Sequence, residues 1–311
     1  MEINNNKAHF DPNDEVEVYV TNDAIHIRKI GYSLPKTRSN IKNLKNGLYM
    51  TKNGEVKKQR QSKKKIDNPI SINRSFKNLR RVVESAVSNA DNKALLSITL
   101  TYKNDCTDTD QLQHDFDNFL KRLRRYVKSH FNNAFFSYIK VFEPYENPDE
   151  HNKPRWHIHL LTIGLYYIDR NIVAKLWKQG GPNSVFVKPL KDRDPLSVAM
   201  YYTGYINTDE DLPEKTKSIA KRISKKQRLE MYPRNFAIYS TSRSIKPVRW
   251  HKVKMQDIID KYPDAYVINS AGRDVKNNNK RVNRYDYLNL MKANSRFVRK
   301  EYKKFDIKEF K

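Results

Sequence analysis

Two strand patterns meet in residues 135–163, which read FFSYIKVFEPYENPDEHNKPRWHIHLLTI. Residues 135–142 and 156–163 are rich in aromatic and β-branched side chains, a composition typical of strands. The segment between them, Pro144–Pro154, is rich in proline, asparagine and acidic residues and predicts a turn. The sequence therefore predicts two antiparallel strands joined by a long connection.

More strands and helices are expected around this pair. The alternating segments 95–101, 185–187 and 236–239 predict three further strands. Apolar residues at helical spacing predict helices after Arg74, at Thr109 or Asp110, at Asp169 and at Asp194, the last running to Ile206. From residue 94 the order is β-α-β-β-α-β-α-β. Strands joined by both hairpins and helices indicate an α+β fold, an antiparallel sheet with helices packed on one face.

The two ends of the chain are expected to extend from this centre. Residues 1–66 are interpreted as an N-terminal basic extension with one strand at 16–20 and a linker or arm at 36–66. Residues 67–250 form the central domain. Residues 251–311 are interpreted as a C-terminal basic extension with one helix at 253–259.

The charge of the chain points to a polyanionic partner. Its 311 residues include 61 Lys and Arg against 35 Asp and Glu, a net charge of +26. The basic residues cluster at 57–65, 121–125 and 221–228. One such run is usually a solvated surface, but three favour nucleic acid, without separating DNA from RNA.

Composition also limits the compartment. The single cysteine, Cys106, cannot form an internal disulfide, which favours a reducing cytosol. No apolar run approaches the roughly 18 residues of a membrane span, and the N-terminus does not have the pattern of a signal peptide. We therefore expect a cytoplasmic protein with no membrane partner.

A metal site is expected on the second strand of the opening pair. His157 and His159 share one face because side chains alternate along a strand, and they lie about 7 Å apart. Glu143 ends the preceding strand and can join them, and two imidazoles with a carboxylate suit a divalent cation. Partly buried histidines bonded to backbone are the alternative, and other carboxylates compete for the third position: Glu146, Asp149 and Glu150.

Two further segments carry groups that could do chemistry. Tyr201 and Tyr205 are four residues apart and share a helix face, a spacing that also fits core packing. Residues 240–247, which include Arg243, follow a strand with hydroxyls and a guanidinium. This segment fits a phosphate-binding loop and a plain turn equally well.

Taken in order, these segments resemble the HUH endonucleases that initiate rolling-circle replication in plasmids and small icosahedral single-stranded DNA phages. Residues 97–102 are similar to the first motif of that family, a strand that ends in Thr-Tyr. Residues 154–161 are similar to the two-histidine motif, and residues 201–205 to the tyrosine motif. The likeness spans roughly residues 75–247. It implies a ferredoxin-like, RRM-like βαββαβα core.

The resemblance also implies a mechanism. His157, His159 and Glu143 hold Mg²⁺ or Mn²⁺, and a tyrosine attacks the scissile phosphate. Tyr205 is the expected nucleophile, and Tyr201 a second nucleophile or a packing residue. The products are a 5′-phosphotyrosine and a free 3′-hydroxyl primer, and the strand is later rejoined.

The DNA-contacting residues expected from this reading are Arg155, Trp156, Lys215, Lys217 and Arg243. The last helix departs from the family because Gly204 and Thr208 stand where a lysine usually follows each tyrosine. Lys215 and Lys217 are the expected substitutes for that lysine.

The expected partners are single-stranded or extruded origin DNA, together with a helicase and a polymerase of a bacterial host. A relaxase or a transposase of the same superfamily would use the same site. A non-catalytic DNA-binding regulator of replication or copy number, and an RNA-binding module on a similar sheet, are the readings from other classes.

Overall fold

The computed structural model describes residues 3–31, 42–44, 48–51, 53–58, 69–90, 94–132, 134–145, 147–190, 192–203, 231–233, 236–246, 248–277 and 280–311. The chain forms two compact units, which we describe separately. The central unit is Lys63–Val248, and the terminal unit combines Met1–Ser62 with Arg249–Lys311. No helix among the described residues is long and apolar enough to cross a membrane.

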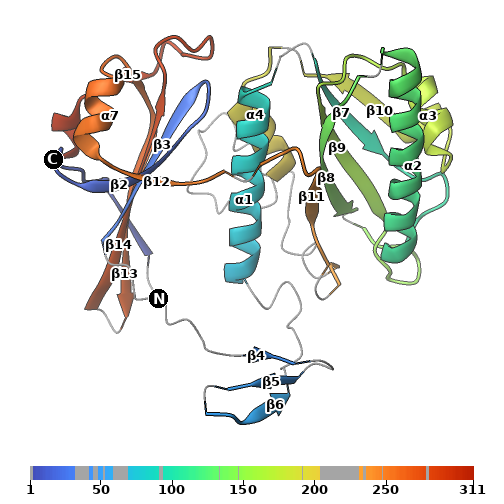
Figure 1. Ribbon diagram of the computed structural model, residues 1–311, viewed down its shortest axis with the longest axis horizontal. Coiled ribbons are helices and arrows are strands. Elements are labelled where there is room, and N and C mark those ends of the chain that lie inside the picture. Colours follow the sequence, from blue (N-terminus) through green and yellow to red (C-terminus); the bar gives the residue numbers. More distant parts are fainter. Residues whose placement is uncertain are drawn as a thin grey trace. The chain divides into compact units, whose positions relative to one another are not determined.

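The central unit is built on a five-stranded antiparallel sheet in the order β10-β7-β9-β8-β11 (Figure 1). Its strands are β7 (Leu95–Leu100), β8 (Ser137–Pro144), β9 (Trp156–Ile163), β10 (Val185–Pro189) and β11 (Tyr239–Thr241). The strand pair expected from residues 135–163 is confirmed as β8 and β9. The last strand begins three residues later than the predicted segment 236–239.

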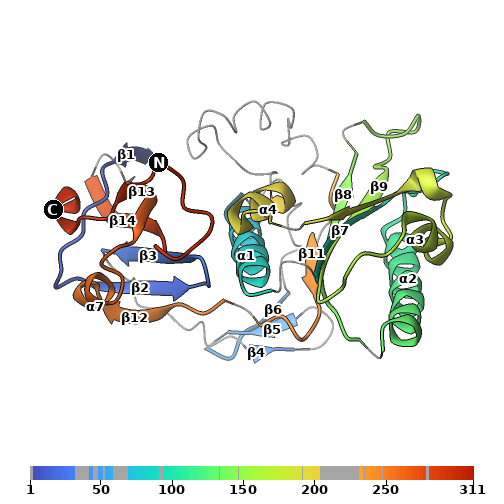
Figure 2. The ribbon, with the colours of Figure 1, turned by 90° about the horizontal axis from the view of Figure 1, so that it is seen from above.

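Helices cover both faces of this sheet. They are α1 (Pro69–Ser88), α2 (Thr109–His130), α3 (Arg170–Trp177) and α4 (Pro195–Thr203). Figure 2 shows the sheet with α2 and α3 on one side and α1 and α4 on the other. The α+β fold is confirmed, but the expectation of helices on one face is wrong. Side chains on both faces of β7 and β9 are buried, so each face needs a cover.

Aspartate side chains begin three of these helices. Asp169 accepts a hydrogen bond from the Asn171 amide, and Asp194 accepts one from the Leu196 amide, as predicted. The N-cap of α2 is Asp108 rather than Thr109 or Asp110. The described part of α4 ends at Thr203, so the predicted continuation to Ile206 falls outside it.

The terminal unit joins both ends of the chain in one seven-stranded sheet, in the order β1-β13-β14-β3-β2-β12 with β15 paired to β13. The strands are β1 (Ile3–Asn6), β2 (Glu15–Val20), β3 (Ala24–Ile30), β12 (His251–Lys254), β13 (Tyr266–Asn277), β14 (Lys280–Met291) and β15 (Lys303–Lys304). Helix α7 is Met255–Lys261, close to the predicted helix.

The two ends are therefore not separate extensions. Ile25 and Ile27 of β3 pair with Leu290 and Leu288 of β14, and all four side chains lie in one apolar core. The hairpin of β13 and β14 is rich in Asn, Arg and Lys, which is why its sequence resembles a basic tail. Part of the expected arm, residues 36–66, forms a small sheet of β4 (Lys42–Asn43), β5 (Leu48–Met50) and β6 (Val56–Lys58).

Candidate metal centre

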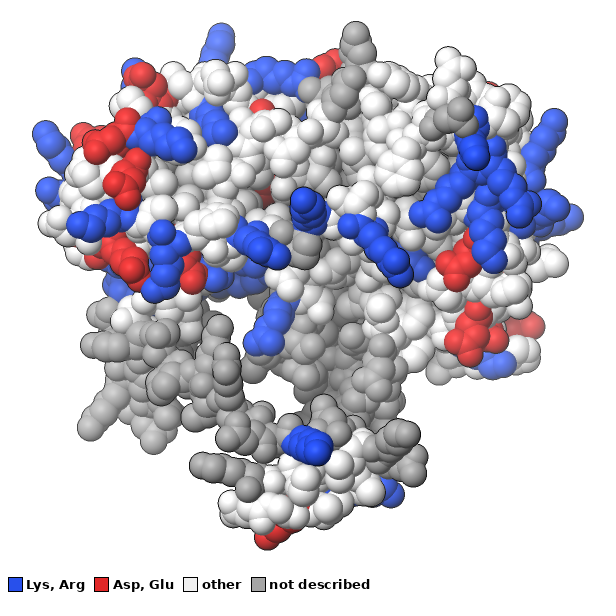
Figure 3. All heavy atoms as spheres, viewed as in Figure 1, with Lys and Arg blue, Asp and Glu red and all other residues white. Residues whose placement is uncertain are grey.

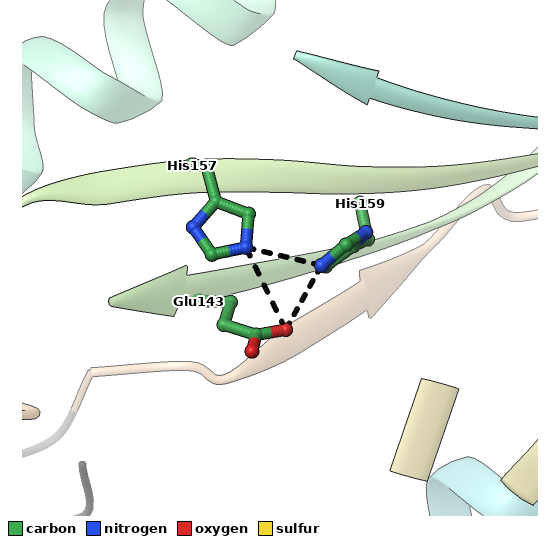
Figure 4. A group of neighbouring side chains, drawn as sticks. All are labelled: Glu143, His157 and His159. Carbon is green, nitrogen blue, oxygen red and sulfur yellow. Dashed lines mark hydrogen bonds and ion pairs between the residues drawn. The ribbon is translucent and has the colours of Figure 1, made fainter. Parts of the chain in front are cut away.

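Strand register brings three predicted ligands to one place. Glu143 lies directly opposite His157 in the β8–β9 pair, and His159 follows two residues later. Because side chains alternate along a strand, all three point to the same face of the sheet. Figure 4 shows their polar ends turned toward one another.

The ligand atoms lie at distances suited to a single ion. Oε2 of Glu143 is 2.9 Å from Nε2 of His159 and 3.8 Å from Nε2 of His157. The two Nε2 atoms are 3.1 Å apart. Ligands held at about 2.1 Å from one cation lie about 3.0–3.4 Å from each other, so a small adjustment of His157 completes the geometry. These residues can hold a metal ion, and two nitrogen donors with one oxygen suit Mn²⁺ better than Mg²⁺.

A residue that the sequence reading did not assign orients one ligand. Thr99 on β7 is the register partner of His159, and its Oγ1 lies 3.2 Å from Nδ1 of that ring. When Nδ1 donates its proton to Oγ1, Nε2 presents its lone pair to the site. The signal was available, because alternation along β7 places Thr99 on the same face as Ser97 and opposite His159.

Tyr201 on α4 stands beside this cluster. Its ring lies edge-on to His159 with the centroids 5.8 Å apart, and 61% of the residue is exposed. Desolvation of the hydroxyl raises the pKa of Tyr201, the Glu143 charge raises it further, and a hydrogen bond with Thr99 opposes both. The phenol is therefore neutral near pH 7 in the absence of a cation.

The adjacent tyrosine has a different environment. Tyr202 is 3% exposed, and its hydroxyl lies 2.8 Å from Oγ of Ser97. Burial raises the pKa of Tyr202 well above its usual range. This residue packs α4 onto the sheet and leaves Tyr201 facing the site. Tyr205, Lys215 and Lys217 lie outside the described residues.

The two residues before His157 have separate surroundings. The Arg155 guanidinium stacks over Tyr145 at 5.2 Å from the ring centroid and lies 3.3 Å from Asp105. Tyr145 in turn packs on His157, with centroids 4.4 Å apart, so Arg155 lies close to the metal site.

Trp156 is not an exposed stacking platform, so that expectation is wrong. It is 1% exposed and packs against Tyr232 and Phe236. The physical reason is strand alternation, which turns Trp156 to the face opposite His157.

The other candidates lie in turns. Asp149 accepts hydrogen bonds from backbone amides of its own turn, and Glu150 contacts His151, so neither joins the metal ligands. Glu146 lies outside the described residues. Ser242 exchanges backbone hydrogen bonds with Tyr138, which favours the plain-turn reading of residues 240–247, and Arg243 is exposed there.

Comparison with known proteins adds a family to this geometry. Residues 95–228 match the model of the replication-associated protein ORF2 family. The matched segment contains all three metal-ligand candidates and both tyrosines, although it covers less than half of the chain. The match supports a role in replication initiation. Searches against curated proteins and against solved structures gave no significant match.

Proposed function

We propose that this chain initiates rolling-circle replication by nicking single-stranded origin DNA through a tyrosine. The observation that carries the proposal is the meeting of Glu143, His157 and His159 with Tyr201, which comes from a separate helix. The family match to replication-associated proteins supports the same reading.

The proposed reaction is a transesterification. The Tyr201 hydroxyl attacks phosphorus, a bond forms between the phenolic oxygen and phosphorus, and the bond from phosphorus to the 3′-oxygen breaks. The phenolic proton leaves Tyr201, and the departing 3′-oxygen takes up a proton, so a 5′-phosphotyrosine and a free 3′-hydroxyl result. A divalent cation on the three ligands would supply Lewis-acid stabilisation of the charge on the phosphate.

The residues of the chain have distinct parts in this scheme. Glu143, His157 and His159 hold the cation, with Mn²⁺ favoured over Mg²⁺ by the donor set. Thr99 orients His159 and contacts the Tyr201 hydroxyl. Arg155 lies beside the site and is proposed to bind the DNA backbone, as are Arg243, Lys215 and Lys217. The free 3′-hydroxyl would prime synthesis by a host polymerase, with a helicase opening the duplex.

The test is formation of a covalent adduct. Purified protein with Mn²⁺ and its origin strand should give a protein–DNA band that survives boiling in detergent, and EDTA should prevent it. Tyr201→Phe should lower the yield at least 100-fold, because a phenyl ring has no nucleophile. Tyr167→Phe, at another exposed tyrosine, is the matched control and should change nothing.

Tyr205 is tested in the same experiment. Loss of the adduct in Tyr205→Phe but not in Tyr201→Phe would transfer the role of nucleophile to Tyr205. A full yield of adduct in the double variant would exclude both tyrosines. DNA binding with no adduct under any metal condition would favour the non-catalytic regulator.

A further inference from the structure

The C-terminal half of α2 carries a concentrated positive charge. Lys121, Arg124, Arg125 and Lys128 are all exposed. In Figure 3, Lys and Arg side chains gather over α2, at the right of the view. The sequence contains no Asp or Glu between Asp117 and Glu143, so no neighbour along the chain compensates this charge.

This arrangement does not help the helix to fold. Lys121 with Arg125, and Arg124 with Lys128, are like-charged pairs at i, i+4, which destabilise a helix. The helix dipole favours cations only in the last turn and so accounts for Lys128 alone. An anion bound along this surface would remove the repulsion.

An exposed aromatic ring borders the charge. Phe135 is 70% exposed and lines a shallow pocket with Arg124 and Lys128. The loop that begins at Gly164 closes against it, because a Cβ at Gly164 would lie 3.2 Å from the carbonyl oxygen of Phe135. Tyr166 and Tyr167 follow in that loop and are both about half exposed.

This surface is separate from the metal centre. Phe135 precedes β8, whereas Glu143 lies near its other end, and six residues of strand span about 20 Å. The surfaces also face opposite sides of the sheet. Phe116 of α2 packs on Phe142, whereas Tyr202 of α4 contacts Ser97 on the other face.

We propose that Lys121, Arg124, Arg125, Lys128 and Phe135, the α2 patch, bind single-stranded DNA. The cations match the phosphates, and an exposed ring beside them can stack only on a base that is unpaired. The segment bound there is distinct from the one at Tyr201. The inference does not depend on nicking, because it concerns affinity alone.

The first experiment reverses charge. Arg124→Glu/Lys128→Glu and the control Lys303→Glu/Lys308→Glu change the net charge equally, and the control residues lie on an exposed part of the terminal unit. Binding of oligo(dT) to the full chain is measured by fluorescence anisotropy, in EDTA, over a salt series. The α2 variant should bind at least tenfold more weakly, and its salt slope should fall by about 0.7 for each phosphate that is no longer neutralised. The control should weaken binding much less.

The second experiment tests stacking. Phe135→Ala should weaken binding to oligo(dT) about fivefold or more and leave binding to a blunt duplex unchanged. Phe186→Ala, at an exposed ring on β10, is the control and should leave both unchanged. Thermal unfolding of every variant should match the parent, since all these residues are exposed.

Two outcomes would overturn the proposal. Equal decreases in affinity for the α2 variant and its charge-matched control would mean that the patch acts only through net charge, as a surface for another partner would. Equal effects of Phe135→Ala on single strand and duplex would remove the role of stacking.

Discussion

His159 has a different partner at each ring nitrogen. Nε2 faces Glu143 at 2.9 Å, and Nδ1 faces the hydroxyl of Thr99 at 3.2 Å. The hydroxyl therefore sets both the tautomer and the orientation of the ring. Such supporting contacts commonly contribute about 10- to 100-fold to metal affinity.

Thr99→Val should therefore weaken Mn²⁺ binding by about 10- to 100-fold, because it removes this partner and keeps the shape of the side chain. Isothermal titration with Mn²⁺ provides the measurement. Thr162→Val is the control, since Thr162 is buried on β9 but on the opposite face. Equal affinities in the Thr99 variant and the parent would show that the hydroxyl does not orient the ligand.

Lys140 is an unusual residue on β8. It is 6% exposed, its Nζ donates to Oε1 of Gln113 at 2.6 Å, and it lies over the rings of Phe116 and Phe142. Burial lowers the pKa of Lys140 to about 8, and the charge of Asp117 opposes this only in part. Folding therefore carries the cost of a buried charge below that pH.

Stability should consequently rise with pH between about 8 and 10.5, since the unfolded chain binds more protons there than the folded one. Lys140→Met should remove this contribution, so its stability relative to the parent should fall by roughly 1–3 kcal/mol from pH 7 to pH 10. Urea unfolding at several pH values measures it, with the exposed Lys153→Met as control. A constant difference between variant and parent would contradict the lowered pKa.

At the scale of elements, α4 gives two adjacent tyrosines opposite environments. Tyr202 points to the sheet and bonds Ser97, and Tyr201 lies beside His159 and remains largely exposed. The helix is held at its start by Asp194, whose carboxylate accepts from the Leu196 amide and the Ser197 hydroxyl. Its placement determines which phenol reaches the metal centre.

The two tyrosines should therefore separate stability from chemistry. Tyr202→Phe leaves the buried Ser97 hydroxyl without its bond and should lower the free energy of unfolding by about 1–2 kcal/mol, with adduct formation retained. Tyr201→Phe should do the reverse. Urea unfolding and the adduct assay, run on both variants, check this, and a stable but inactive Tyr202→Phe would reverse the assignment.

At the scale of the whole molecule, the positive charge is shared equally. The terminal unit has 28 Lys and Arg against 15 Asp and Glu, and the central unit has 33 against 20, so each has a net charge of +13. The metal centre is confined to the central unit. Affinity for a polyanion should therefore be spread over surfaces that take no part in catalysis.

His157→Ala/His159→Ala should abolish the adduct while preserving most of the affinity for single-stranded DNA and the salt slope of binding. The adduct assay and anisotropy at several salt concentrations measure the two effects on one preparation. If affinity and adduct disappear together, the histidines support the fold of the DNA-binding surface rather than the chemistry.

Much of the central unit could be read from local pattern. The alternation in residues 156–163 predicts both the strand and the shared face of His157 and His159, because the period of two is a property of any strand. Asp169 and Asp194 predict helix starts for an equally local reason. The exposure of Trp156 could not be read this way, because it depends on which face of the sheet receives Tyr232 and Phe236.

Sequence pattern alone thus sufficed for the β8–β9 pair, for the acid and two imidazoles on one face, and for the excess of positive charge, since each depends on short-range periodicity or on composition. The pairing of β3 with β14, the helices on both faces and the choice of Tyr201 over Tyr202 as the neighbour of His159 depended on long-range packing. Residues far apart in the chain must meet before such contacts exist, and no local pattern encodes which partner they will meet.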